Sequence, residues 1–435
     1  MNSHTKNRSH DATPQVEIQA SFDREALGTA DPEAHLIVRL RGKKAAPGAP
    51  TPPVSLAIVI DASGSMGGAK LANVKHAALL LARRLRPCDR IAVVSFADDV
   101  VIHCRPQAMT AEQLALIEAE LRTLRTRGST DLSAGWLTGA ALLEPIIEPG
   151  RRTHVILLSD GMANRGLCDP TALGERARAL RLAGITTTCV GVGAGYSTTQ
   201  LGPIAEHGGG RFHHADEAHA IERLLLGELE ELGAVAVRNV CLGVDAGPDP
   251  VVEPVSELVA ARSGDQPGTP GGFLLGDLVD GAERTVVFRV KLRDPAVRPT
   301  PWQVRVTLAG QHADGSRELT PIESICVLPP SDAGHVPPRP EDAEVVAGAW
   351  SASVLRRAAD FNERELYPHV QDLLRTEARR MSEYVRGIRQ AESALRRACA
   401  LVEKLTSPVP PPVQKEVFQQ GYKGSKGERD LRTTR

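Results

Sequence analysis

One short loop rich in acidic and hydroxyl side chains is the part of this 435-residue sequence best suited to chemistry. The apolar run VSLAIVID (54–61) has the pattern of a buried strand and ends in Asp61, and Ser63 and Ser65 follow at alternate positions. One carboxylate and two hydroxyls on a tight, glycine-containing loop are hard oxygen ligands, which suit Mg²⁺, Mn²⁺ or Ca²⁺ better than softer metals. The spacing therefore predicts a divalent-metal site.

Two further oxygen donors also lie next to the start or the end of a predicted helix or strand. Thr130 lies in GSTDL, just before a helical pattern, and Asp160 lies in LLSDG, at the end of an apolar strand pattern. Ligands of open α/β sheets gather beyond the carboxyl ends of the strands, so we expect both side chains to join Asp61. A turn whose Ser and Asp only cap the next helix is the simpler alternative. It leaves Thr130 and Asp160 unexplained.

The elements that must position these residues alternate between apolar strand runs and helix-period segments from 54 to about 233. Continuous apolar strands separated by helices predict an α/β domain with a doubly wound, mostly parallel sheet covered on both faces. The strand runs are VSLAIVID, RIAVVSF, HVILLSDG and TTTCVGVG. The helical segments are KLANVKHAALLLARRL, TAEQLALIEAELRTL and TALGERARALRLAG, followed by a last helix over 217–232.

These motifs together resemble a known family. DASGSM at 61–66, Thr130 in GSTDL and Asp160 in SDG are similar to the metal-ion-dependent adhesion site of the von Willebrand factor type A domain. The resemblance extends through DRIAVVSFADD (89–99) and covers roughly 54–233. No part of the family's five-part site is missing, and the three segments occur in the family's order.

The resemblance implies a role for each residue of the site. Ser63 and Ser65 would ligate the metal through their hydroxyls, Thr130 would do so directly or through water, and Asp61 and Asp160 would act largely through water. The direct ligands are then mostly neutral, which leaves the ion positively charged and able to accept a carboxylate from a partner. Mg²⁺ is the expected ion, with Mn²⁺ or Ca²⁺ as alternatives.

An enzyme is the competing interpretation of the same loop. The segment 63–67 lies between a strand and a helix as a nucleophile elbow does, with Ser65 as nucleophile and Asp160 and His207 as imaginable partners. The leading glycine of G-x-S-x-G is replaced by Ser63, however, and no HGGG-like segment for an oxyanion hole stands upstream. We therefore expect a binding protein and not an enzyme, and keep a serine hydrolase as the alternative.

Period-two patterns flank the α/β domain on both sides. VEIQASF and EAHLIVRLRG precede it, and AVAVRNVCLGV and QVRVTLAG follow it, with the alternation typical of half-buried strands. We expect these segments to form one β-sandwich, followed by a hairpin of two helices in which Pro368 starts a new helix. The predicted divisions are a disordered N-terminus (1–14), strands with a proline-rich linker (15–53), the α/β domain (54–233), the β-sandwich (234–328), a linker (329–343), a helical region (344–406) and a flexible basic tail (407–435).

The flanking strands, with the phrase FLLGDL, resemble those around the type A domain in inter-alpha-trypsin-inhibitor-like and calcium-activated-chloride-channel-like proteins. Bacterial cytosolic relatives share this layout. Some relatives carry a RING-type zinc module, but the seven cysteines here are scattered singly and exclude one. The same scatter fits neither a zinc ribbon nor a disulfide framework.

Composition limits the classes of partner. The formal net charge of −1 gives no general attraction to nucleic acid or anionic lipid, and aromatic residues make up only 3% of the chain, so base stacking is not expected. The polar start MNSHTKNRSHDATPQ lacks a signal peptide, and no apolar run is long enough to span a membrane. We expect a cytoplasmic protein.

These expectations define an intracellular scaffold or adaptor that binds an acidic residue of a partner protein through Mg²⁺. A structural subunit assembled through its C-terminal helices is the other alternative that the sequence leaves open.

Overall fold

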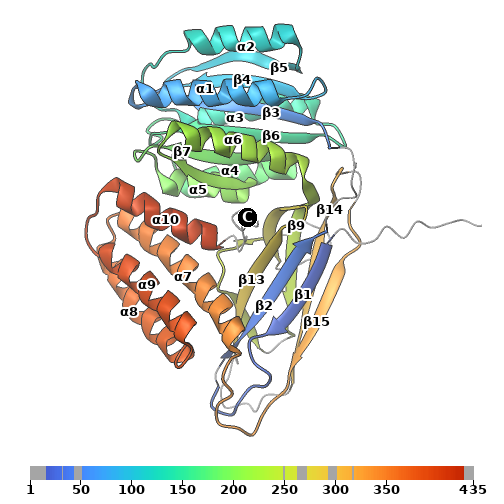
Figure 1. Ribbon diagram of the computed structural model, residues 1–435, viewed down its shortest axis with the longest axis vertical. Helices are drawn as coiled ribbons and strands as arrows, with labels where there is room; N and C mark the ends of the chain where they lie inside the picture. The colour runs from blue at the N-terminus through green and yellow to red at the C-terminus, as the bar shows by residue number, and fades with distance from the viewer. Residues whose placement is uncertain are drawn as a thin grey trace, which may run out of the picture.

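The computed structural model describes residues 16–31, 33–43, 51–247, 250–261, 272–291, 301–315 and 318–425. The N-terminus predicted to be disordered (1–14) and most of the proline-rich linker (44–50) lie outside these ranges. Figure 1 shows an α/β layer, a pair of antiparallel sheets and a group of C-terminal helices that lies beside them.

The α/β layer is built on a six-stranded sheet with the order β5-β4-β3-β6-β7-β8. All neighbouring strands are parallel except β4 and β5, which are antiparallel. The strands are β3 (Val54–Asp61), β4 (Arg90–Phe96), β5 (Val100–Ala108), β6 (Arg152–Ser159), β7 (Ile185–Val192) and β8 (Gly209–Ala215). The predicted doubly wound, mostly parallel sheet is confirmed.

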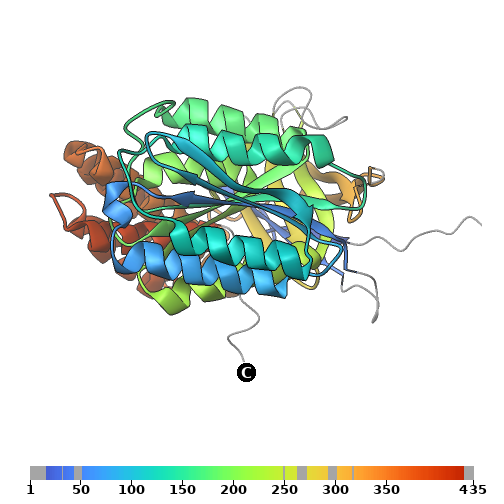
Figure 2. The same cartoon turned by 90° about the horizontal axis from the view of Figure 1, so that it is seen from above.

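Helices cover both faces of this sheet, as the view from above shows (Figure 2). Leu56, Ile58 and Ile60 of β3 pack toward one group of helices, and Ala57 and Val59 pack toward the other, as the alternation of a strand requires. The first group is α1 (Ala69–Arg84), α2 (Ala111–Thr123) and α6 (Ala218–Gly233). The second group is α3 (Leu132–Leu143), α4 (Pro170–Leu182) and α5 (Thr198–His207).

Two antiparallel sheets pack face to face and contain strands from both sides of the α/β domain. Their orders are β1-β2-β13-β10 and β11-β12-β9-β14-β15. Alternate residues of β2, such as Leu36 and Val38, pack with Val304 and Val306 of β14 in one buried cluster. The strands are β1 (Val16–Phe22), β2 (Glu33–Gly42), β9 (Val235–Asp245), β10 (Val251–Pro254), β11 (Val259–Ala260), β12 (Phe273–Val279), β13 (Glu283–Lys291), β14 (Trp302–His312) and β15 (Ile322–Leu328).

The C-terminal region forms four helices where the sequence predicted two. They are α7 (Pro340–Glu363), α8 (Tyr367–Tyr384), α9 (Arg389–Lys404) and α10 (Pro411–Ser425). Pro368 stands in the first turn of α8, as predicted. The predicted linker (329–343) ends earlier than expected because α7 begins at Pro340. The start of the linker is held by a hydrogen bond from the Leu27 amide to the Pro329 carbonyl (2.9 Å).

The prediction of a flexible tail over 407–435 is wrong for the part that forms α10. Val417, Phe418 and Tyr422 are buried, in one apolar cluster with residues of α7 and β8. At Gly421 a Cβ atom would lie 2.8 Å from the Ala352 carbonyl oxygen, so glycine lets α10 approach α7 closely. These contacts with distant segments stabilise a helix that Gly421 and Gly424 make weak on local propensity alone.

Within the described part of the chain, none of the helices combines the length and the apolar character needed to cross a bilayer.

Candidate metal centre

Asp61 lies at the centre of the candidate site's hydrogen bonds, and the strand register explains its position. It is the last residue of β3, and Ile60 pairs with Leu158 of β6, which places Asp61 beside Ser159. Its Oδ1 accepts a hydrogen bond from the Ser63 amide (2.8 Å), and its Oδ2 accepts one from the Ser159 hydroxyl (2.6 Å). The side chain is buried, so these bonds fix the carboxylate at the carboxyl edge of the sheet.

The loop after Asp61 turns its two serine hydroxyls toward each other. It forms a short 3₁₀ turn, η1 (Gly64–Met66), which is anchored in the core by the buried Met66 side chain. The Oγ atoms of Ser63 and Ser65 are 3.1 Å apart. The Ser65 hydroxyl donates to Asp160 Oδ1 (2.7 Å). The first loop is thus joined directly to the loop after β6.

Thr130 lies in the loop between α2 and α3. The Thr130 amide donates to Asn164 Oδ1 (3.3 Å), and the Asn164 amide donates to the Thr130 carbonyl (3.2 Å). Asp131, the next residue, caps α3 by accepting a hydrogen bond from the Ala134 amide (2.9 Å). Thr130 is therefore held between a helix start and the loop after Asp160, and its side chain is mostly buried.

Gly161 shows how closely the three loops converge. A Cβ atom built on this glycine would lie 3.3 Å from Thr130 Oγ1, 3.6 Å from Ser65 Oγ and 3.7 Å from Asp61 Oδ2. Oxygen atoms from the loop after β3 and from the loop before α3 therefore both approach Gly161, in the loop after β6. The five residues predicted from the sequence come together here, while their role as metal ligands stays a prediction.

The electrostatics of this cluster favour a cation. Asp61 and Asp160 are 0% and 1% exposed. Burial is the largest cause of a raised pKa of Asp61, and the charge of Asp160 raises it further, against hydrogen bonds from Ser159 and Ser63 that lower it. A positive ion between the loops would stabilise both ionised carboxylates, so the donor set fits a hard divalent cation.

Hydroxyl oxygens make up part of this donor set. Throughout the described ranges, no three or more His, Cys, Asp and Glu side chains form a group that could hold a metal ion. Within these ranges a metal site would need other donors as well, and the cluster around Gly161 offers hydroxyls beside its carboxylates. This composition suits Mg²⁺, Mn²⁺ or Ca²⁺ better than a softer ion.

Two residues of the site were missed in the sequence. Ser159 immediately precedes Asp160, but its hydrogen bond to Asp61 depends on the pairing of two strands. Lys70 of α1 forms an ion pair with Asp160 Oδ2, and its Nζ donates to the Ser65 carbonyl (3.3 Å). A signal was available for Lys70, because a cation in the first turn of a helix opposes the helix dipole and needs a partner.

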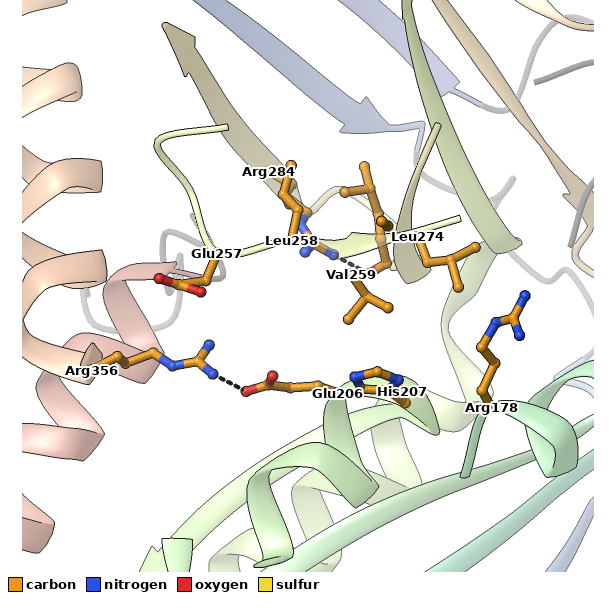
Figure 3. A pocket seen from close by; sticks show the side chains of 11 residues that line it. Arg178, Glu206, His207, Glu257, Leu258, Val259, Leu274, Arg284 and Arg356 are labelled. Carbon is orange, nitrogen blue, oxygen red and sulfur yellow. Dashed lines mark hydrogen bonds and ion pairs between the residues drawn. The ribbon is translucent and has the colours of Figure 1, made fainter. Parts of the chain in front are cut away.

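The serine hydrolase alternative requires a histidine next to Ser65, and the structure places His207 elsewhere. Ser65 is hydrogen-bonded to Ser63, Asp160 and Lys70. Figure 3 shows His207 among the side chains that line a separate cavity between the α/β layer, the sandwich and α7. The volume of this cavity is about 380 Å³. This cavity is lined by Arg178, Glu206, His207, Glu257, Leu258, Val259, Ala260, Leu274, Leu275, Arg284 and Arg356. The imagined triad is not assembled.

The adjacent histidines of β8 also lie outside the site, on opposite faces of the sheet as their alternation predicts. His213 Nε2 is 2.7 Å from Glu228 Oε1 of α6. His214 Nδ1 is 3.0 Å from the Tyr196 hydroxyl, and its Nε2 is 2.8 Å from Asp216 Oδ2. Both rings thus have partners of their own.

A parallel sheet with helices on both faces and oxygen donors from three loops at its carboxyl edge defines a Rossmann-like domain with a candidate cation site. The family model of the von Willebrand factor type A domain matches residues 55–225. These residues form a von Willebrand factor type A domain. Domains of this family often bind a divalent metal at an adhesion site and mediate protein interactions, and most family members are non-enzymatic.

Relatives and a solved structure agree with this assignment. The chain is 27% identical to the uncharacterized protein YfbK of Escherichia coli over 204 residues, which is 46% of this chain and 35% of that protein. It is 33% identical to the inter-alpha-trypsin inhibitor heavy chain H3 of Pongo abelii over 137 residues, 30% of this chain and 16% of that protein. The chain thus matches about a third or less of these relatives' length.

The fold of the whole chain, beyond the type A domain, recurs in a solved structure. The von Willebrand factor type A protein from Catenulispora acidiphila superimposes with a TM-score of 0.69 at 17% sequence identity, covering 97% of this chain and 99% of that one. The α/β domain, the sandwich and the C-terminal helices therefore form a combination that is not peculiar to this sequence.

Proposed function

We propose that this protein is a metal-dependent scaffold or adaptor that holds an acidic residue of a partner protein through Mg²⁺. The ion would be held by Asp61, Ser63, Ser65, Thr130 and Asp160. The observation that carries the proposal is the convergence of Thr130 Oγ1, Ser65 Oγ and Asp61 Oδ2, all within 3.7 Å of the position that a Cβ atom of Gly161 would take. Mn²⁺ or Ca²⁺ are the alternative ions for this set of hard oxygen donors.

In this proposal the hydroxyl residues and the carboxylate residues have different roles. The hydroxyls of Ser63, Ser65 and Thr130 supply neutral oxygens, while Asp61 and Asp160 orient the serine loop through their hydrogen bonds. A divalent ion held largely by neutral ligands keeps its attraction for a partner's carboxylate, which is the chemistry it supplies when bound. The remaining affinity would come from the protein surface around the site.

A cytoplasmic location is part of the proposal. All seven cysteines, which lie within the described ranges, are free thiols. Free and scattered thiols are typical of reducing compartments, where disulfides are rare. Cell fractionation with an antibody to the chain would test this point, and recovery of the protein from an oxidising compartment would contradict it.

Capture of partners by the full-length chain tests the central proposal. We expect EDTA to abolish capture, Mg²⁺ to restore it, and Thr130→Val to lose it, because valine keeps the shape of threonine without its oxygen. Thr138→Val is a matched control, since the Thr138 hydroxyl donates only to the Ala134 carbonyl inside α3 (2.7 Å). Capture that persists in EDTA and in Thr130→Val would contradict the proposal.

A further inference from the structure

Lys70 places a fixed positive charge beside the candidate metal centre. Its ammonium forms an ion pair with Asp160 Oδ2, and the other oxygen of the same carboxylate accepts the hydrogen bond from Ser65. The Asp160 side chain is 0% exposed, whereas the Lys70 side chain is 38% exposed. The ammonium therefore lies between a buried carboxylate and solvent, at the rim of the site.

The ion pair with Asp160 and the packing of the stem on Gly193 hold Lys70 in this position. Lys70 stands in the first turn of α1, where the helix dipole disfavours a cation, so the ion pair with Asp160 offsets an unfavourable placement. The lysine stem runs over Gly193 in the loop after β7. A Cβ atom at Gly193 would lie 3.2 Å from Lys70 Cε, and the positive φ of this residue (69°) also favours glycine.

The charges of the site sum to a definite value. Asp61 and Asp160 each contribute minus one and Lys70 contributes plus one, so the cluster carries minus one before any ion binds. A divalent ion brings this sum to plus one. If Lys70 were neutral, the cluster would change from minus two to zero on binding the same ion. Lys70 thus decides whether the loaded site is positive or neutral.

We infer that Lys70 is a built-in counter-charge that weakens metal binding and keeps the loaded site positive, so that it selects anionic partner groups. The inference rests on the proposed function and adds the residue that sets the selectivity of the site. Charges a few ångströms apart at the edge of a protein interact strongly enough to change binding constants by an order of magnitude. The partial exposure of the ammonium moderates this effect without removing it.

Metal affinity is the first readout. Titration of the full-length chain with Mn²⁺, followed by the electron paramagnetic resonance signal of the free ion, gives the dissociation constant without any partner. We expect Lys70→Met, which keeps the stem and removes the charge, to bind Mn²⁺ about tenfold more tightly. Lys70→Arg keeps the charge and should bind like the wild type.

Arg84→Met is the matched control for loss of one positive charge. Arg84 is exposed at the other end of α1, roughly 21 Å from Lys70 along a helix with a rise of about 1.5 Å per residue. At physiological ionic strength this distance exceeds the screening length of about 8 Å, so the Mn²⁺ dissociation constant should not change.

Anion selectivity is the second readout. The variant that binds Mn²⁺ more tightly should bind an anion more weakly. Acetate bound next to Mn²⁺ is detected by the faster relaxation of its methyl protons, and acetamide serves as the neutral probe of the same shape. We expect Mn²⁺-loaded Lys70→Met to bind acetate about fivefold or more weakly than the loaded wild type. Acetamide should show no such difference between the two proteins.

The outcomes separate this inference from the proposed function. A Lys70→Met variant with unchanged or weaker Mn²⁺ affinity, or with unchanged acetate affinity, would overturn the role of Lys70 and leave the metal site intact. Failure of the wild type to bind Mn²⁺ would overturn both. Tighter Mn²⁺ binding together with weaker acetate binding supports the inference.

Discussion

Gly161 has no side chain, and a side chain at this position would contact three oxygen atoms of the candidate site. Its ideal Cβ position is 3.3 Å from Thr130 Oγ1, which is a tight contact, and 3.6 and 3.7 Å from Ser65 Oγ and Asp61 Oδ2, which are ordinary van der Waals contacts. A methyl group can therefore be accommodated by the fold but would lie against these three oxygens. This geometry makes the residue a test of the site that leaves every proposed ligand unchanged.

We predict that Gly161→Ala lowers Mn²⁺ affinity by at least about tenfold while the free energy of unfolding changes by less than about 1 kcal/mol. Spin-resonance titration and urea unfolding measure the two quantities. Gly227→Ala is the control, because a Cβ at this position of α6 meets nothing within 4 Å. Unchanged Mn²⁺ affinity in Gly161→Ala would place the ion elsewhere.

At the residue scale the sequence identified which side chains gather, but not how they are held. Asp61, Thr130 and Asp160 could be predicted because each follows a strand or precedes a helix at the same edge of a parallel sheet. The hydrogen bond from Ser159 to Asp61 and the ion pair of Lys70 depend on strand pairing and on one side-chain conformation. No local pattern shows the hydrogen bond of Ser159, whereas the place of Lys70 in the first turn of α1 indicates that it needs a partner without saying which one.

A buried cluster that joins α6 to the sheet makes stability depend on pH. Burial lowers the pKa of His154 in β6, against the charges of Glu228 in α6 and Asp277 in β12, which raise it. His154 Nδ1 is 2.7 Å from the Thr186 hydroxyl of β7. The folded chain thus keeps this imidazole neutral at a pH where the unfolded chain, with a pKa of about 6.5, takes up a proton.

We predict that stability falls as the pH drops below about 6.5, because the unfolded state then binds more protons than the folded state. The contribution of His154 is fully present above this value and declines by at most about 1.4 kcal/mol per pH unit. Urea unfolding at pH 7.5 and 5.5 measures it. His154→Gln should show a smaller loss between the two values, and an equal loss would contradict this origin.

The helix α10 depends on a bond to the edge strand β8. The buried Phe212 amide donates to the Tyr422 hydroxyl (2.9 Å), and both rings pack edge to face with centroids 5.7 Å apart. We predict that Tyr422→Phe costs about 1–2 kcal/mol, since it leaves a buried amide unpaired. Urea unfolding checks this value, with Tyr367→Phe at the half-exposed start of α8 as control. Equal stability of the two variants would contradict the assigned contact.

At the element scale, the periodicity of apolar residues predicted the elements that have a clear local pattern. The buried strands of the α/β sheet are continuous apolar runs and were found, whereas β5 was missed because this edge strand is half exposed and irregular in its pattern. Four C-terminal helices appeared where two were expected. The helix α10 begins with Pro411 and contains Gly421, and its stability comes from segments far away in the chain, so composition alone suggested a flexible tail.

The same contacts bear on the structural-subunit alternative. Val417, Phe418 and Tyr422 are used inside the chain, where they cover β8 and α7. The apolar face of α10 is therefore already buried without another subunit.

One apolar cluster spans the type A domain and the C-terminal helices. Buried residues of α3, α4 and α5 belong to the same cluster as those of α7 to α10. Glu363 at the end of α7 accepts a hydrogen bond from the Thr198 amide at the start of α5 (3.1 Å). Lys415 Nζ of α10 lies 4.8 Å from the centre of the Tyr196 ring. The two parts are thus joined by apolar and polar contacts.

We predict that this shared core makes the α/β domain and the helices unfold together. Differential scanning calorimetry should show one transition for both, which Mg²⁺ shifts upward because only the folded chain forms the site. At a free concentration 100 times the dissociation constant, the ion should stabilise the folded state by about 2.7 kcal/mol. Separate transitions of which only one responds to Mg²⁺ would show that the C-terminal helices are energetically independent of the site.

Calorimetric titration of the full-length chain with Mg²⁺ tests the central claim most directly. We predict one ion per wild-type chain and none for Asp61→Asn, since asparagine keeps the shape of a buried group but removes its charge. Asp98→Asn, at an exposed acid in the loop after β4, should bind like the wild type. Equal binding by Asp61→Asn and the wild type would contradict a metal centre at the end of β3.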